Sequence, residues 1–582
     1  MGSLAMIVVT FVGYLIAYHT YGRFLARRVF KIDPAARVPS HRYADGKDFV
    51  PTRRGIIFGH HYTSIAGTGP IVGPAIGIIW GWVPALLWVF FGSIAMGAVH
   101  DLGALVISLR HDGKSIADIV SGYINPRVRI LCFLIVFLEL WIVIAIFALI
   151  IAVLFTMYPH AVFPIWMEVP IAVALGYAIY KRKANVALAT AVAVIAMYGT
   201  IVLGEYVSIK FDAFGAAQTG VWACILLVYA YIASTLPVTT LLQPRDFINA
   251  WQLFIAMALL CAGAVGAALL KDMAIVAPAF NPSPKGAPPL VPFLFVTIAC
   301  GAISGFHSLV ASGTSSKQLD NERDALYVGY GSMLMEGALA VLVIVAVAAG
   351  IGLAYETASG ETLTGAVAWK AHYSAWLGDK GLPDKLSAVV VGSANMMETI
   401  GIPKGIALIL MGVFIASFAG TTLDTATRIQ RYIIVELARE VKLPALGRVH
   451  VATSVAVLTA LALAFSSGSG EGAKRFSGVG AMQLWPMFGA VNQLLAALAL
   501  LLMTIYLKRK GGVKWLVTGL PFVFLLAVTG LAVFYNETTF FMRGQWLLAF
   551  VNGSAALLAL WMVIEGYAAF AAPVRSGQKK LQ

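Results

Sequence analysis

Histidines, hydroxyls and helix-breaking residues interrupt an otherwise apolar stretch near the N-terminus. The stretch reads Gly59-His60-His61-Tyr62-Thr63-Ser64-Ile65-Ala66-Gly67-Thr68-Gly69-Pro70. Glycine and proline interrupt helices, and backbone groups freed at membrane depth are tolerated only where they face protein or a water-filled cavity. A break of this kind therefore predicts a binding site. Its candidate substrate-binding residues are His60, His61, Thr63, Ser64, Gly67, Thr68 and Gly69.

A second apolar stretch carries the same mixture of residues. Its candidate substrate-binding residues are Ser304, Gly305, His307 and Ser308. Because imidazole titrates near neutral pH, His61 and His307 could donate to a substrate carboxylate or carry a proton. Half-helix N-termini at the two breaks would add N–H donors and a positive dipole end suited to an anion. A buried, hydrogen-bonded structural role is the alternative for each histidine.

Acidic side chains also fall inside apolar stretches, at Asp101, Glu139, Glu336 and Asp424. An unpaired carboxylate is costly in hydrocarbon and marks an ion pathway or a salt bridge. We expect Asp101, Glu139 and Glu336 to join the histidines His61 and His307 as a proton relay. Amides such as Asn492 and Gln493 in another apolar stretch favour hydrogen bonding between helices over a polar path.

Two pairs of charged residues lie close together in the sequence. Asp424 and Arg428 are four residues apart on one helical face, which predicts an intrahelical ion pair with a structural or a gating role. His100 and Asp101 are adjacent and point about 100° apart on a helix. Their side chains should therefore contact two different neighbours. Arg245 follows a proline at a helix start, where we expect a structural role near the headgroups, with an inner gate as the alternative.

The composition indicates that these residues lie on membrane-spanning helices. Of 582 residues, 60% are hydrophobic and 12% are charged, and the mean hydropathy is +0.85. This is too apolar for a large soluble enzyme. The sequence predicts an all-α, polytopic membrane protein with about fifteen apolar runs near the length of a membrane helix. The expected spans are 4–20, 56–79, 82–108, 129–157, 162–180, 184–207, 219–241, 248–271, 291–316, 327–354, 404–435, 449–466, 480–507, 514–535 and 546–570.

Basic residues collect in alternate loops, which sets the expected orientation. The formal net charge is +14, but the Lys and Arg clusters fall where they would meet anionic lipid, so nucleic acid is not implied. They place the N-terminus outside and the C-terminus in the cytoplasm of a multi-pass protein of the cell inner (plasma) membrane. The loop at 355–385 is then an external cap, and the short apolar piece 386–397 is re-entrant or interfacial.

The sequence carries no enzyme signature. It lacks a Walker-type loop, and its four cysteines show no disulfide or zinc spacing. We expect no enzymatic activity and no cofactor, and transport energy must then come from an ion gradient. A channel or a non-transporting membrane sensor is an alternative class, and an intramembrane hydrolase using His61 and Asp101 is a remote one.

The two broken stretches also indicate an internal repeat. Each is followed by a span that opens alike, with Gly92-Ser93 in one case and Gly331-Ser332 in the other. By the loop charges the two broken spans run in opposite directions, as an inverted repeat requires.

Longer strings resemble one known family. FGHHYTSIAGTGPIVGPAIG, GAVHDLGALVISLRHDGKSI, LLQPRDFIN and FAGTTLDTATRIQRYIIVELARE, in this order, resemble the carbon starvation protein A (CstA) family of inner-membrane transporters. The resemblance spans about 54–507. It implies uptake of small nutrients, either peptides or pyruvate with protons, and a LeuT-like (APC-type) core of five plus five inverted helices.

The resemblance also implies a division of the chain. The expected parts are 1–55 (N-terminal helix and basic cytoplasmic loop), 56–210 (first five-helix repeat), 211–290 (two inserted helices and an external loop), 291–507 (second repeat, with the cap 355–385) and 508–582 (two C-terminal helices and a basic tail).

A sodium site is the competing hypothesis for the coupling ion. The segment 416–425 resembles the eighth core helix of sodium:solute symporters, in which hydroxyls complete a sodium site. A hard cation prefers oxygen ligands, and the expected set is Ala66, Gly69, Ser417, Thr421 and Thr422. Hydroxyls on membrane helices also commonly bond to the preceding turn, so both interpretations stay open. The sequence leaves H⁺ or Na⁺ as coupling ion, a monocarboxylate or a short peptide as substrate, and the oligomeric state undecided.

Overall fold

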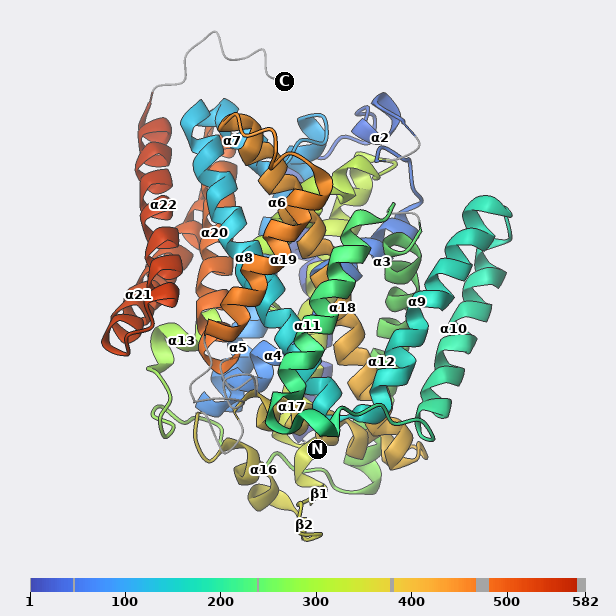
Figure 1. The fold of residues 1–582 in the computed structure, drawn as a ribbon. Helices are drawn as coiled ribbons and strands as arrows, with labels where there is room; N and C mark the ends of the chain where they lie inside the picture. Colours follow the sequence, from blue (N-terminus) through green and yellow to red (C-terminus); the bar gives the residue numbers. More distant parts are fainter. Residues whose placement is uncertain (1, 46–47, 238–239, 377–380, 467–480, 573–582) are drawn as a thin grey trace.

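The computed structural model describes residues 2–45, 48–237, 240–376, 381–466 and 481–572. It is almost entirely helical (Figure 1). The helices are α1 (Gly2–Ala17), α2 (Pro39–Arg42), α3 (Arg54–Ile65), α4 (Gly69–Gly77), α5 (Trp82–Gly92), α6 (Ala98–Arg110), α7 (Ile116–Tyr123), α8 (Pro126–Met157), α9 (Val162–Gly176), α10 (Val186–Gly204), α11 (Gln218–Thr235), α12 (Leu242–Leu270), α13 (Leu290–Thr297), α14 (Gly305–Gly313), α15 (Ser332–Ala348), α16 (Gly365–Tyr373), α17 (Leu382–Glu398), α18 (Lys404–Glu440), α19 (Val449–Ser466), α20 (Ala481–Arg509), α21 (Leu516–Met542) and α22 (Trp546–Ala571).

The predicted membrane spans are present. Thirteen helices among the described residues are long and apolar enough to cross a membrane, and the bent pair α3–α4 raises the number to fourteen. The pair α13–α14, interrupted by residues 298–304, occupies the remaining predicted span. The all-α, polytopic architecture with broken helices is therefore confirmed.

The first break, at residues 66–68, falls where the sequence places it, whereas the second, at residues 298–304, ends where the expected stretch begins, because Gly305 to Gly313 form the helix α14. The axis bends by 43° between α3 and the helix that starts at Gly69. In the second break Gly301 has φ +88°, a conformation that favours glycine because it has no Cβ. The two breaks touch, since a Cβ at Gly69 would overlap the side chain of Cys300. The first residue of α4 thus packs against a side chain of the second break.

The predicted cap and the short apolar piece lie at one end of the molecule. Strands β1 (Tyr355–Glu356) and β2 (Thr362–Leu363) pair antiparallel, with Tyr355 opposite Leu363. Together with α16 they lie at the end opposite α2 and α7 (Figure 1). Helix α17, which holds the apolar piece, packs on α4, α12, α15 and α18.

Packing of the central helices bears on how the chain is divided. Helix α12 lies against α3, α17 and α18, and α20 lies against α14, α8 and α6. Helix α10 packs mainly on α9 and exposes Leu188 and Ile195, at one edge of the molecule in Figure 1. The division at residues 210 and 290 stays a prediction. This packing favours an alternative in which α11 and α12 belong to the first repeat and α9–α10 is the inserted pair.

Replacing Gly489 by Ala should destabilise the protein. Helix α20 meets the end of α13 at this glycine, where a Cβ would overlap the backbone oxygen of Val296. Overpacking of this kind costs about 1–3 kcal/mol. The matched control is Gly530→Ala in α21, which has no neighbour within 4 Å and should be neutral or stabilising. Thermal unfolding of the purified proteins measures both, and equal midpoints for the two variants would contradict this packing.

Candidate functional site

A buried polar network lies where α6, α14 and α15 meet. His307 on α14 donates through Nδ1 to Oδ2 of Asp101 at 2.9 Å, and its Nε2 lies 3.3 Å from Oε2 of Glu336. His100 bonds to the other oxygen of Asp101 at 2.8 Å. All four side chains are fully buried. We call His100, Asp101, His307 and Glu336 the His307 network; it brings three of the predicted relay residues together.

One expectation about this network is wrong in part. His100 and Asp101 do not point to separate neighbours, since their side chains bond to each other at 2.8 Å. A short aspartate next to an imidazole Nδ1 can close this contact along the helix surface despite the 100° between the two positions. The second oxygen of Asp101 still reaches another helix through His307. The adjacent pair therefore acts as one unit facing α14.

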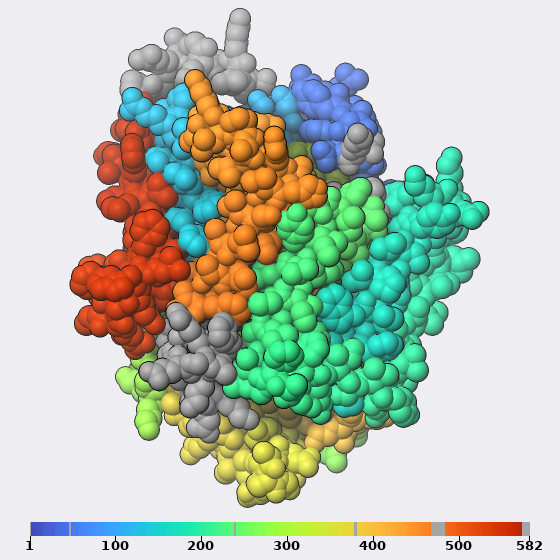
Figure 2. Space-filling view, in the orientation of Figure 1, coloured from blue at the N-terminus to red at the C-terminus, as the bar shows by residue number. Residues whose placement is uncertain are grey.

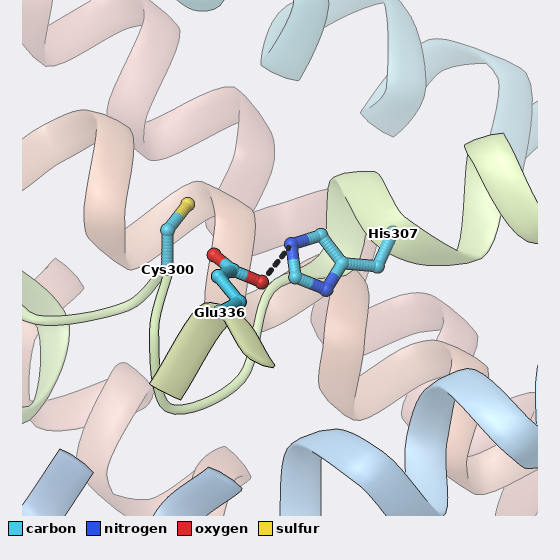
Figure 3. A group of neighbouring side chains, drawn as sticks. All are labelled: Cys300, His307 and Glu336. Carbon is cyan, nitrogen blue, oxygen red and sulfur yellow. Dashed lines mark ion pairs between the residues drawn. The ribbon is translucent and has the colours of Figure 1, made fainter. Parts of the chain in front are cut away.

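The second break holds Glu336 in place. Its Oε1 accepts a hydrogen bond from the backbone N–H of Gly301 at 2.9 Å, so a backbone donor freed by the break faces a carboxylate. Figure 3 shows Cys300 beside Glu336 and His307. The sulfur, a ring nitrogen of His307 and a Glu336 oxygen lie within 4.8 Å of one another. Zinc accepts these donor types, but Glu336 Oε2 lies 3.3 Å from His307 Nε2 in an ion-pair geometry, so we assign them to a charge network.

Asn492 of α20 holds the start of α14. Its Oδ1 accepts from the backbone N–H of Phe306 at 3.0 Å and from the hydroxyl of Ser304 at 3.1 Å. This is the capping role of an amide at an exposed helix N-terminus. Gln493 donates to the carbonyl of Phe295 at 2.8 Å. The predicted role of these amides in joining helices is confirmed. The backbone N–H of Phe306, at the N-terminus of α14, therefore already has a protein acceptor.

The hydroxyls of the first break differ in their contacts. Thr63 donates to the carbonyl of Gly59 and Ser64 to that of His60, both at 2.7 Å, so each bonds to the preceding turn. In the second break Ser308 does the same to Gly305 at 2.7 Å. The hydroxyl of Thr68, at the start of α4, is buried and has no hydrogen-bond partner among the described residues. Thr68 is thus the one of these four hydroxyls without a hydrogen-bond partner in the described part of the chain.

The adjacent histidines of α3 lead to different places. His61 is buried and its Nδ1 bonds to Ser315 at 2.7 Å, which ties α3 to the residues after α14. His60 is partly exposed and its Nδ1 lies 3.4 Å from Asp246. The relay candidate Glu139, on α8, is buried and has no hydrogen-bond partner within the described part of the chain. The structure does not bring His60 or Glu139 into the His307 network.

His60 lies at the wall of a large cleft. The cleft measures about 1100 Å³ and is lined by the residues before α3, the start of α10 and the start of α12, including Arg53, Gln243 and Gln318. It lies toward the end opposite the cap, where the teal α9–α10 hairpin stands apart from the blue N-terminal segment (Figure 2). The lining is mostly apolar, with the polar side chains of His60, Arg53, Gln243 and Gln318 among it.

The three hydroxyls of the expected sodium site face different neighbours. Ser417 donates to Glu168 of α9, and Thr421 accepts from Asn249 of α12 at 2.7 Å. Thr422 donates to the carbonyl of Phe418 at 3.2 Å. A Cβ at Gly67 would overlap the Thr422 hydroxyl, so this part of α18 does touch the first break. The structure brings Thr422 to the break but gives every one of these hydroxyls a protein partner.

The predicted ion pair between Asp424 and Arg428 is wrong. Asp424 Oδ2 accepts from Arg245 at 2.6 Å and from the Tyr229 hydroxyl at 2.9 Å. Arg428 instead donates to the carbonyl of Leu236, just after α11, where helix carbonyls lack intrahelical partners. Arg245 is therefore buried inside the bundle and does not lie among headgroups.

Glu168 is the functional candidate that the sequence interpretation missed. It lies on α9, is buried, and has Ser417 and Arg245 as neighbours. The signal was present, because Glu168 is an acid inside an expected span like the four that were named.

Replacing Asp101 by Asn should destabilise the protein strongly. Asparagine cannot accept from both histidines, and removing one partner of a buried ion pair costs about 3–5 kcal/mol. The control is Asp118→Asn, which makes the same change in the partly exposed pair with Arg129, where about 0–1 kcal/mol is expected. Thermal unfolding in detergent compares the two variants, and an Asp101→Asn variant as stable as Asp118→Asn would show that the network carries no charge.

Comparisons with known proteins agree with the family that the sequence strings resemble. The sequence model of the family described as carbon starvation protein CstA matches residues 2–532. The peptide transporter CstA of Campylobacter jejuni is 32% identical, over 90% of this chain and 79% of that protein. The pyruvate/proton symporter BtsT of Escherichia coli is 31% identical, over 95% of this chain and 85% of that protein.

Among solved structures, the crystal structure of MhsT in complex with L-phenylalanine aligns with a TM-score of 0.45 and 12% identity, covering 88% of this chain and 98% of that chain. The family assignment does not depend on this alignment. The match over nearly the whole sequence shows that the chain belongs to the carbon starvation protein CstA family.

Proposed function

We propose that the protein is a secondary active transporter that takes up a small carboxylate together with protons by alternating access. Its relatives carry the names of peptide and pyruvate transporters, and pyruvate is the first substrate to test. The observation that carries the proposal is the position of the His307 network, which joins the second broken span to α6 and α15. In an alternating-access cycle the second broken span would move relative to α6 and α15. A proton would then be bound and released at the network that joins them.

The charge balance of the network favours a proton as the coupling ion. Two carboxylates, Asp101 and Glu336, face the imidazole of His307. If these three groups are ionised while His100, the fourth member of the network, stays neutral, one negative charge is left over in a fully buried site, which is unfavourable in a low dielectric. Binding one proton removes this excess. Because Glu336 also accepts from the backbone of Gly301, a change in its charge acts directly on the second break.

The sodium alternative has weaker support. Ser417, Thr421 and Thr422 already bond to Glu168, Asn249 and Phe418. A sodium ion would have to replace these hydrogen bonds, whereas a proton needs no coordination shell. Na⁺ symport is therefore the second candidate for coupling.

The substrate site is proposed at the first break. The free hydroxyl of Thr68 lies at the N-terminus of α4, where the helix dipole favours a carboxylate. A small monocarboxylate fits such an enclosed place better than a peptide, which also needs room for its amine and side chains. His60 and the cleft behind it form the route to the cytoplasm. This orientation, with basic loops inside and the N-terminus outside the inner membrane, is the one that the loop charges predict.

Pyruvate uptake into proteoliposomes tests the coupling. An inward proton gradient should drive accumulation of labelled pyruvate in the wild type, and an inward sodium gradient should not. In Glu336→Gln the charge that binds the proton is gone, so accumulation should be lost while exchange of internal for external pyruvate persists. Glu537→Gln, in a contact between α21 and α22, is the matched control and should accumulate pyruvate normally.

Other outcomes would redirect the proposal. Accumulation under the sodium gradient alone would favour the hydroxyl site, and accumulation by Glu336→Gln equal to wild type would remove Glu336 from coupling. Exchange of dipeptides without pyruvate uptake would make short peptides the substrate.

Replacing Thr68 by Val should weaken substrate binding without weakening the fold. The hydroxyl makes no bond to the described protein, so its loss leaves nothing unpaired in the empty protein, and thermal stability should be unchanged or higher. Losing one hydrogen bond to a charged substrate should raise the KM for pyruvate roughly 10-fold. Thr453→Val on α19, whose buried hydroxyl bonds to the carbonyl of Val449, is the control with unchanged KM. An unchanged KM in Thr68→Val would move the carboxylate site elsewhere.

A further inference from the structure

A buried arginine occupies a pocket of oxygen atoms between α9, α11, α12 and α18. Arg245 Nη1 lies 2.6 Å from Asp424 and 2.8 Å from the Tyr229 hydroxyl. Its Nε lies 3.7 Å from Oε2 of Glu168, and Glu168 in turn accepts from Ser417. These five residues form the Arg245 cluster. The side chains of Arg245, Glu168 and Asp424 are at most 4% exposed.

We infer that Arg245 stands in for a monovalent metal cation in this pocket and thereby sets the ion specificity of transport to H⁺ over Na⁺. This inference rests on the proposed function, since it names the residue that excludes the alternative coupling ion. It makes Arg245 a specificity-determining residue and gives it no contact with the substrate.

The pocket has the chemistry of a sodium site. Two carboxylates, a serine hydroxyl and a tyrosine hydroxyl are hard oxygen donors of the kind that bind small cations. Ser417 and Asp424 belong to the same part of α18 as Thr421 and Thr422. The guanidinium presses against α18 between them, since a Cβ at Gly420 would overlap Arg245 Nη2. The positive charge of Arg245 therefore lies against the part of α18 that was expected to supply the hydroxyl ligands of a sodium ion.

An arginine fills such a pocket permanently. Its guanidinium stays protonated in proteins, and it is tethered to α12, so it cannot dissociate and be transported. Without it, Glu168 and Asp424 would be two uncompensated carboxylates inside the bundle, which is strongly unfavourable. Asp424 Oδ1 and Glu168 Oε2 still have no hydrogen-bond partner among the described residues, so oxygens remain to ligate another cation if the arginine is removed.

The space around the arginine supports this exchange. A small cavity of about 20 Å³ borders Arg245, Tyr229 and Gly420, enough for about one water molecule. Truncating the arginine would enlarge it to hold an ion and its remaining water. Helix α12 also carries Asp246, which faces His60 on α3. Arg245, which fills the pocket, thus lies on α12, the helix that packs on the first broken span.

A purely structural salt bridge makes a different prediction. If Arg245 only joins these four helices, its removal destabilises the protein to the same extent in every monovalent salt. If it stands in for a cation, sodium should restore what the arginine supplied. The response to Na⁺ therefore separates the two roles.

The experiment compares wild type, Arg245→Lys and Arg245→Ala by thermal unfolding in NaCl and in choline chloride at equal ionic strength. Wild type and Arg245→Lys should show equal midpoints in the two salts. Arg245→Ala should show a saturable rise of at least about 3 °C in NaCl, together with binding of ²²Na⁺. The double variant Arg245→Ala/Asp424→Asn removes a ligand and should lose both responses.

Each remaining outcome overturns the inference. Sodium-specific stabilisation of the wild type would show that the pocket is not filled by Arg245. An Arg245→Ala variant that binds no ²²Na⁺ would leave only the structural role. If this variant folds too poorly in choline to purify, folded protein should still be recovered from sodium buffer, and recovery in neither salt also contradicts the inference. Proton-driven pyruvate uptake by the wild type tests the proposed function separately and does not depend on these variants.

Discussion

The cost of placing charge inside an apolar bundle is the constraint on which this structure depends. The buried carboxylates of the His307 network and of the Arg245 cluster all lie in the interior, where an uncompensated charge is strongly unfavourable. Each cluster meets this constraint in its own way. Two acids share the imidazole of His307 in one, and two acids share the guanidinium of Arg245 in the other. Imidazole can release a proton near neutral pH and guanidinium cannot, which gives the two clusters different roles.

The two broken spans connect these charges to the backbone. Gly69 of the first break touches Cys300 of the second, and the second break donates its Gly301 N–H to Glu336. On the other side, Thr422 of α18 touches Gly67, and Asp246 of α12 faces His60. A change of charge in the His307 network therefore acts on the second break, which touches the first break that we propose to hold the substrate. This contact is the physical basis for coupling in the proposed mechanism.

The sequence could predict what is local. Glycines, prolines and histidines inside apolar runs marked both breaks, and single acids marked Asp101 and Glu336, because each of these signals lies within one span. It could not predict pairing across spans. Asp424 has Arg428 on its own face, but the nearer partner is Arg245, which is 179 positions away. The same holds for His60 and His61, whose adjacent positions lead to a cleft and to Ser315. The place of α12 beside α3 is likewise a matter of tertiary packing, which apolar periodicity does not encode.

The most direct test of this account is the number of protons bound when pyruvate binds to the purified protein. Calorimetric titration in buffers of different ionisation enthalpy measures it without any gradient. We expect uptake of about one proton per pyruvate in the wild type and close to none in Glu336→Gln. Pyruvate binding with no proton uptake in the wild type would contradict it, because substrate and proton would then not share the network around His307.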